Sequence, residues 1–289
     1  MEYNLTDIAT VKKLLSAAGF TFSKALGQNF ITDASVCPKM AALSGIGPED
    51  GVLEIGPGVG VLTVELAKTA KTVVAVELDK RLLPVLAKTL DGCNNVFVEN
   101  ADVMKTDLQA LAEQYFAPGQ KLHVCANLPY YITSPVLMRL LGCGVPFETL
   151  TLMVQKEAAE RITARLGQRE AGALTAAVEY YTEAELLFGV KPGSFTPPPK
   201  VSSAVIRLTR RAFPPVETAN EEFFFRTVRA AFTHRRKTAV NGLAGELGIS
   251  KENVAKALSA LGLPADTRAE TLDMAAFAAL ADRLYELKG

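Results

Sequence analysis

The sequence has no tryptophan, only two histidines and only four cysteines, none of which forms a Cys-x-x-Cys pair. Protein zinc sites are built from closely spaced cysteines and histidines, and here only His123 and His234 could supply nitrogen ligands. We therefore expect no metal site, and we expect cysteines that remain reduced and mostly buried.

The sequence also lacks a long apolar run and a recognisable leader segment. No stretch reaches the roughly 20 apolar residues that are needed to span a bilayer. Residues 1–20 contain Glu2 and Asp7 and have no basic start followed by an unbroken apolar stretch. Because 49% of the residues are apolar and 21% are charged, the composition is typical of a globular protein. We expect a cytoplasmic protein without a membrane segment and, in the absence of an obvious dimer seam, a monomer.

An excess of charge of one sign is absent as well, since 31 basic residues balance 31 acidic residues. Taken alone, this balance argues against a nucleic-acid partner. The segment 200–240 nevertheless contains nine basic and only three acidic residues, a net charge of +6. Such a segment favours an anionic partner through its local field and through counterion release, and the alternative is a solvated basic face.

Hydrophobic patterning predicts that short strands alternate with helices over most of the chain. Two helices, over 5–18 and 34–43, come first and flank a polar connector. Strands are then predicted at 51–55, 72–77, 95–99, 121–126 and 148–154, with helices at 61–70 and 80–90 and further helical stretches between the later strands. This order is typical of a parallel sheet with helices on both faces. Strands at 184–190 and 203–208 follow, and the proline-rich stretch between them predicts an irregular loop.

The composition changes after residue 211. The stretch 212–216 has the features of a linker, and the residues after it are rich in alanine and leucine at helical spacing, with no clear strand. We therefore expect an α/β fold with a Rossmann-like, mostly parallel sheet in a domain at 1–211, which includes the N-terminal helical segment. A small all-helical domain follows at 212–289.

A glycine loop, Glu54-Ile-Gly-Pro-Gly-Val-Gly60, follows the first predicted strand. Gly56 and Gly58 allow the backbone to approach a ligand closely. The spacing is Gly-x-Gly-x-Gly and not the dinucleotide fingerprint Gly-x-Gly-x-x-Gly, because Val61 occupies the last position. A glycine loop of this kind is weak evidence for a nucleoside site by itself.

Two acids follow the next strands of the same sheet. Glu77 ends the second strand and can accept hydrogen bonds from ribose hydroxyls, and Asp102 follows the third strand and can accept from an adenine amino group. The glycine loop holds Glu54 and no lysine or arginine. Such a site favours a sulfonium-bearing nucleoside, S-adenosylmethionine, over NAD, although Lys80 and Arg81 lie near Glu77 in the sequence. The alternative is that each acid only caps a helix or ends a strand.

The tetrapeptide Asn127-Leu-Pro-Tyr130 follows the fourth strand. An adenine amino nitrogen is a poor nucleophile because its lone pair is shared with the ring. The Asn127 side-chain oxygen and the Leu128 carbonyl could accept its N–H bonds and free that lone pair. Pro129 would fix the backbone, and Tyr130 could stack on the base. The alternative is an ordinary strand-to-turn segment with a core tyrosine.

These motifs resemble those of the ribosomal RNA adenine dimethyltransferases, in particular the bacterial small-subunit branch, over nearly the whole chain. The similarity extends to the stretches 26–31, 52–60, 76–79, 194–203 and 232–237. The resemblance implies a class I methyltransferase fold that binds S-adenosylmethionine and methylates adenines. It assigns cofactor contacts to the following residues: Asn29, Ile31, Gly56, Gly58, Glu77, Asp102 and Asn127. It also makes Phe195 the second aromatic around the target adenine, whereas read alone Phe195 would be a packed loop anchor.

The basic segment would then bind ribosomal RNA. If a helix beginning at Glu221 continued through Lys237, then Arg226, Arg229, Arg236 and Lys237 would share one face. Arg235, in the same basic stretch, is also predicted to contact the RNA. The resemblance implies 16S rRNA in an immature 30S subunit as the partner, with two adjacent adenines in the 3′-terminal hairpin loop as the target.

Three alternatives are weighed against this function. One is a large-subunit rRNA methyltransferase that gives macrolide resistance, which the stretch 232–237 and the Phe195 loop disfavour. A second is a ribosome-assembly factor that mainly binds, which the intact tetrapeptide argues against, although a secondary checkpoint role stays compatible. The third, a nicotinamide oxidoreductase, fails on its glycine spacing.

Overall fold

A computed structural model describes residues 3–20, 29–233 and 237–288. The chain divides into two compact units. The first combines Met1–Ala159 with Glu185–Arg210, and the second combines Glu160–Ala184 with Arg211–Gly289. The predicted helical domain at 212–289 thus belongs to a unit that also takes in a segment from the middle of the chain. Among the described residues, no helix has both the length and the apolar character that crossing a membrane requires.

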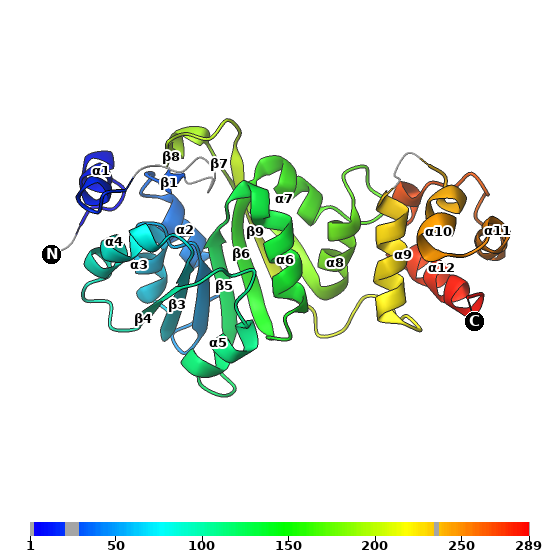
Figure 1. Ribbon diagram of the computed structural model, residues 1–289, viewed down its shortest axis with the longest axis horizontal. Coiled ribbons are helices and arrows are strands. Elements are labelled where there is room, and N and C mark those ends of the chain that lie inside the picture. The colour runs from blue at the N-terminus through cyan, green and yellow to red at the C-terminus, as the bar shows by residue number, and fades with distance from the viewer. Residues whose placement is uncertain (1–2, 21–28, 234–236, 289) are drawn as a thin grey trace. The chain divides into compact units, whose positions relative to one another are not determined.

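The first unit is built on a mostly parallel sheet, as the sequence predicts (Figure 1). The order of its strands is β4-β3-β2-β5-β6-β9-β7, with β6 and β9 antiparallel and the pairs from β4 to β6 parallel. The strands are β2 (Gly51–Ile55), β3 (Thr72–Glu77), β4 (Val96–Asn100), β5 (Leu122–Asn127), β6 (Phe147–Gln155), β7 (Thr182–Val190) and β9 (Ser203–Arg210). The strand order reverses between β2 and β5, which is where ligands bind in open α/β sheets.

Helices cover this sheet because its central strands are apolar on both faces. All five residues of β2 are buried. One face, which includes Val52, Val73 and Met153, packs in a single core with α2, α3 and α4, and α6 lies in front of the sheet in Figure 1. The helices of this part of the chain are α1 (Ile8–Ala17), α2 (Val36–Ala42), α3 (Val61–Ala67), η2 (Lys80–Leu82), α4 (Leu83–Thr89), α5 (Leu108–Tyr115), η3 (Tyr130–Ile132), α6 (Thr133–Gly142), α7 (Lys156–Thr163), which runs into the second unit, and η4 (Pro192–Ser194).

One small sheet lies where the sequence predicts only irregular chain. Strand β1 (Phe30–Ile31) pairs antiparallel with β8 (Phe195–Thr196), so that Phe30 is opposite Thr196 and Ile31 is opposite Phe195. The prediction of an irregular loop over 191–200 is therefore wrong at its centre. Two-residue strands show no alternation of polar and apolar residues, which is why the pattern does not reveal them.

The second unit has its own hydrophobic core. Its helices are α8 (Ala173–Tyr181), α9 (Glu221–Thr233), α10 (Ala239–Leu247), α11 (Lys251–Ala260), η5 (Ala269–Thr271) and α12 (Met274–Glu286). Phe224 is fully buried and contacts the ring of Tyr180, at 5.5 Å between ring centroids. Phe225 stacks on Tyr181 at 5.5 Å. The phenylalanine run at the start of α9 is thus packed against α8 of the same unit.

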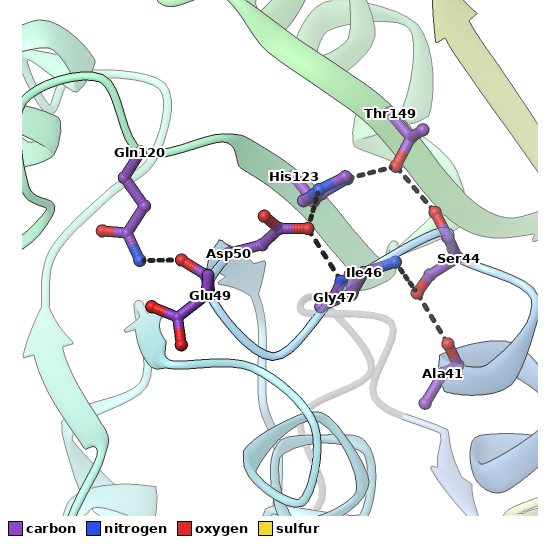
Figure 2. A network of polar contacts seen from close by, with 9 residues as sticks. All are labelled: Ala41, Ser44, Ile46, Gly47, Glu49, Asp50, Gln120, His123 and Thr149. Carbon is purple, nitrogen blue, oxygen red and sulfur yellow. Dashed lines mark hydrogen bonds and ion pairs between the residues drawn. The ribbon is translucent and has the colours of Figure 1, made fainter.

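A buried polar network closes the end of the sheet at which β2, β5 and β6 begin (Figure 2). Thr149 Oγ1 donates to the Ser44 carbonyl at 2.8 Å. Its single hydrogen is used there, so it accepts from Nδ1 of His123 at 2.7 Å. Asp50 Oδ2 lies 3.1 Å from Nε2 of His123 and accepts from the Gly47 backbone N–H at 2.7 Å. This network fastens the connection between α2 and β2 onto β5 and β6.

Thr149→Val should lower the free energy of unfolding by about 1–3 kcal/mol, because it leaves a buried imidazole N–H and a buried carbonyl without a partner. Thr151 is the matched control on the same strand, since its hydroxyl is buried without a hydrogen-bond partner. Thr151→Val should be neutral or stabilising. Urea denaturation of the two variants measures the difference, and equal stabilities would contradict a structural role for the network.

Candidate functional site

A cavity of about 140 Å³ lies at the carboxyl edge of the sheet in the first unit. Every cofactor and catalytic residue that the sequence predicts is in its lining: Asn29, Ile31, Gly56, Gly58, Glu77, Asp102, Asn127, Leu128, Pro129, Tyr130 and Phe195. The structure therefore brings together residues from four strand ends and from two segments that are more than 160 positions apart in the chain. Their roles in binding and catalysis remain predictions.

The glycine loop has a left-handed backbone conformation at the positions where the sequence places glycines. Gly56 and Gly58 have φ values of 69° and 62°, which side chains with a Cβ rarely adopt. The Gly56 N–H donates to the Val76 carbonyl at 3.0 Å, which joins the loop to β3. A Cβ on Gly58 would lie 3.4 Å from the Phe30 ring, so the loop also packs closely under β1.

Glu77 is held in place by backbone donors. One carboxylate oxygen accepts from the Gly58 N–H at 3.3 Å, and the other accepts from the Asp79 N–H at 2.7 Å. Burial raises the pKa of Glu77, and these hydrogen bonds oppose the rise. A carboxylate fixed between the glycine loop and the end of β3 is well placed to accept from the hydroxyls of a ribose.

Asp102 lies at the next strand end. Its Oδ1 accepts from the Met104 N–H at 2.9 Å, and Oδ2 is 3.9 Å from Nζ of Lys105. The carboxylate therefore does cap a turn, as the alternative interpretation proposes. The same carboxylate also lines the cavity, so the capping role orients it without removing it from the site.

Glu54 is noted in the sequence only for its charge in the glycine loop and is not among the predicted site residues. Its side chain is 1% exposed, lines the cavity, and has one carboxylate oxygen, Oε2, without a hydrogen-bond partner. Burial raises its pKa to about 8, the Thr63 hydroxyl opposes that rise, and the charge of Glu77 adds to it. The only sequence signal is an acid inside a glycine loop that has no basic residue.

The charge of the cavity suits a cation. Among the described residues, its lining includes the carboxyl groups of Glu54, Glu77 and Asp102 and no lysine, arginine or histidine. A pyrophosphate would be repelled by the carboxylates of Glu77 and Asp102, whereas a positively charged nucleoside would be stabilised by them and would favour ionisation of Glu54. The residues present therefore fit S-adenosylmethionine better than a dinucleotide.

The Asn127–Tyr130 segment is fixed from both sides. Asn127 Nδ2 donates to the Asn29 carbonyl at 3.5 Å, which leaves Oδ1 as an acceptor in the cavity. The Leu128 N–H donates to the Met153 carbonyl at 3.1 Å, and the Leu128 side chain is buried. The Tyr130 hydroxyl lies 2.7 Å from Oγ of Ser203. These contacts hold two acceptors and an aromatic ring in one place.

Phe195 reaches the cavity through the β1–β8 pair. It is 4% exposed and belongs to the core of the first unit, so the packed-anchor interpretation holds together with its place in the lining. The Thr32 N–H donates to the Ser194 carbonyl at 2.9 Å, and the Ser194 hydroxyl donates to Asp33 Oδ2 at 2.9 Å. The segment that contains Asn29 and Ile31 is thereby tied to the segment that contains Phe195.

The predicted RNA-binding residues lie in the second unit. Arg226 and Arg229 are exposed on α9. The condition of one helix through Lys237 is not met, because Lys237 lies in a bend outside α9 (Glu221–Thr233). Thr238 then caps α10, with extended backbone and its side chain accepting from the Asn241 N–H. Arg235 and Arg236 lie outside the described residues.

The described residues contain no group of three or more histidine, cysteine, aspartate or glutamate side chains that could hold a metal ion. The four cysteines are free.

The family model described as "Ribosomal RNA adenine dimethylase" matches residues 19–286. The chain belongs to this family. It is 47% identical to the ribosomal RNA small subunit methyltransferase A of Geobacillus thermodenitrificans, over 97% of this chain and 98% of that protein. It is 44% identical to the protein of the same name in Streptococcus pneumoniae R6, over 97% and 98% of the two chains.

Solved structures agree with this assignment. The 23S rRNA methyltransferase ErmE has a TM-score of 0.68 and 30% identity, over 89% of this chain and 100% of that chain. A dimethyladenosine transferase from Plasmodium falciparum has a TM-score of 0.70 and 28% identity, over 86% and 95%. The predicted class I methyltransferase fold, with its helical C-terminal part, is confirmed, and so is a family that uses S-adenosylmethionine.

Proposed function

We propose that this protein dimethylates the amino nitrogens of two adjacent adenines in the 3′-terminal hairpin loop of 16S rRNA. The substrate would be the RNA of an immature 30S subunit, and the methyl donor S-adenosylmethionine. The family assignment and the high identity to small-subunit methyltransferases support this proposal. We further propose that the protein acts in the cytoplasm as a monomer.

The observation that carries the proposal is the position of Asn127. Asn127 lines the same cavity as Glu77 and Asp102, and its contact with Asn29 uses the side-chain nitrogen and not the oxygen, so a target amino group and a nucleoside cofactor can meet there. S-adenosylmethionine would supply an electrophilic methyl group on its sulfonium. The Asn127 oxygen and the Leu128 carbonyl would accept hydrogen bonds from the adenine N–H groups, two in the first methylation and one in the second, and leave the nitrogen lone pair pointing at that methyl group. The N–C bond would form as the S–C bond breaks, S-adenosylhomocysteine would leave, and the nitrogen would lose a proton to solvent.

The aromatic residues would hold the target base. Tyr130 and Phe195 both line the cavity, and an extruded adenine loses its stacking partners in the RNA. Rings on the faces of the base would offset that loss. Phe195, fixed by the β1–β8 pair, would be the rigid member, and Tyr130 is oriented by Ser203.

Purified protein, tritiated S-adenosylmethionine and unmethylated 30S and 50S particles test the proposal directly. We expect N6,N6-dimethyladenosine only in the small-subunit RNA. Label in the 50S particle would instead favour the large-subunit enzyme, the candidate that the similarity to ErmE supports. Binding to the 30S particle without any label would leave an assembly factor.

A second prediction concerns α9. Replacing both Arg226 and Arg229 with glutamine should weaken binding to the 30S particle and reduce the slope of log K against log salt by about 1–2, because each arginine that contacts a phosphate releases counterions. The affinity for S-adenosylmethionine should not change, since all the described residues that line the cofactor cavity belong to the first unit.

Arg283→Gln is the matched control for α9. Arg283 lies on α12 of the same unit and pairs with Glu286 at 2.9 Å. Filter binding at several KCl concentrations gives the slopes of both variants. If the double variant and Arg283→Gln have the same slope of log K against log salt, α9 does not belong to the RNA-binding surface.

A further inference from the structure

Four aromatic side chains among the described residues line the cavity, and their exposure differs sharply. Phe30 and Phe195 are buried and Tyr130 is half-buried, but Tyr131 is 57% exposed. An aromatic ring that is mostly exposed at the rim of a binding cavity is a candidate contact for whatever enters that cavity.

The backbone explains why two neighbouring tyrosines differ in this way. They begin the η3 turn, which Pro129 starts and in which the Ile132 N–H donates to the Pro129 carbonyl at 3.1 Å. Successive side chains of a 3₁₀ turn point about 120° apart. The Tyr130 hydroxyl is fixed by Ser203, whereas the Tyr131 hydroxyl has no hydrogen-bond partner in the described part of the chain.

We propose that the Tyr131 ring is a stacking platform for the nucleotide that neighbours the target adenine. This inference rests on the proposed function. When one adenine of a single-stranded loop is extruded into the cavity, the adjacent base loses a stacking partner and one of its faces becomes exposed. The Tyr131 ring, at the rim of the same cavity, offers a replacement at little entropic cost, because it has only two side-chain torsions.

The platform has a consequence for two adjacent targets. When either adenine is in the cavity, the other is its neighbour, but on the 5′ side in one case and on the 3′ side in the other. One exposed ring at one side of the rim can stack with only one of these neighbours. Loss of the Tyr131 ring should therefore slow methylation of one adenine more than methylation of the other.

The test compares wild type with Tyr131→Ala, Tyr131→Phe and Met138→Ala on unmethylated 30S particles at saturating S-adenosylmethionine. Met138 is the control, because it is 45% exposed in the same unit and lies outside the cavity lining. Mass spectrometry of the RNA gives the modification at each adenine. Calorimetry gives the affinity for S-adenosylmethionine.

We expect Tyr131→Ala to raise KM for the particle roughly tenfold, the loss typical of one base–aromatic stack. Its kcat and its affinity for S-adenosylmethionine should stay within about twofold of wild type, and the two adenines should be modified unequally. Tyr131→Phe keeps the ring and should behave as wild type, as should Met138→Ala.

Three results would overturn the inference. One is an unchanged KM with equal modification of the two adenines. Another is a fall in kcat alone, which would mean that Tyr131 supports Tyr130. The third is a loss of affinity for S-adenosylmethionine, which would make the ring a cofactor contact. If wild type itself does not methylate the 30S particle, the proposed function fails and this inference fails with it.

Discussion

Asn127→Ala should lower kcat for adenine methylation by about 100- to 1000-fold, the range found when one preorganised hydrogen-bonding group is removed from an active site. The side chain provides an acceptor for the adenine amino group, and the alanine provides none. Since Asn127 also contacts the Asn29 carbonyl, some loss of cofactor affinity is expected, but it should be smaller than the loss in kcat. Single-turnover methylation of 30S particles measures the chemical step.

Asn127→Asp distinguishes an acceptor from a merely structural side chain. The aspartate keeps an acceptor oxygen at the same position and should retain much more activity than the alanine variant. It loses the N–H that bonds to Asn29, so it should be the worse variant if Asn127 only held the cavity closed. An aspartate variant as inactive as the alanine variant would therefore count against direct acceptance of the adenine N–H bonds.

The second large effect concerns Glu54 and pH. Because its pKa is raised to about 8 in the folded protein, the folded state holds a proton there that the unfolded chain releases above about pH 4.5. The stability that this proton contributes is fully present below pH 4.5 and is lost as the pH rises through 8. Glu54→Gln should therefore stabilise the protein at pH 9 by a few kcal/mol and have little effect at pH 5.

The proton on Glu54 should also affect the binding of the cofactor. A positively charged ligand in the cavity favours the Glu54 carboxylate, so at pH 7 S-adenosylmethionine should bind with release of a proton, and its affinity should rise toward pH 8–9. In Glu54→Gln this pH dependence should disappear. Urea denaturation gives the stabilities, and calorimetry in two buffers of different ionisation enthalpy counts the protons.

Glu49→Gln is the control for both Glu54 measurements. The Glu49 carboxylate is exposed in the same unit and pairs with Lys71 at 2.7 Å. It should leave the pH profile unchanged, because exposed pairs contribute little. Identical stabilities of wild type and Glu54→Gln at pH 9 would rule out a raised pKa of Glu54 in the folded state.

Much of the cavity was predictable because parallel strands end at a common edge. The bounds predicted for β2 and β3 agree with the structure. Glu77 and Asn127 end β3 and β5, Asp102 follows β4, and the three meet at that edge because the strands are parallel. A short run of apolar residues between glycine and polar residues is a strong signal when the strand is buried on both faces.

Other features depend on contacts that a linear pattern does not contain. The segment Glu160–Ala184 belongs to the second unit because α8 packs on the phenylalanines of α9, and an apolar helix face does not specify its partner. The unpaired oxygen of Glu54 is visible only once its neighbours are placed. Lys237 lies in a bend next to the cap at Thr238, and a single threonine in a basic stretch does not reveal that cap.

The short β1–β8 pair has a consequence for how the two ligands affect each other's binding. Ile31 and Phe195 face each other across a two-residue ladder, which the bonds from Ser194 to Thr32 and Asp33 extend. The backbone that is expected to close over the cofactor is thus hydrogen-bonded to the segment that carries the ring expected to hold the target base. A ligand that orders one of these two segments also favours the ordered conformation of the other, and such coupling is reciprocal. Cofactor and RNA should each raise the affinity for the other by the same factor.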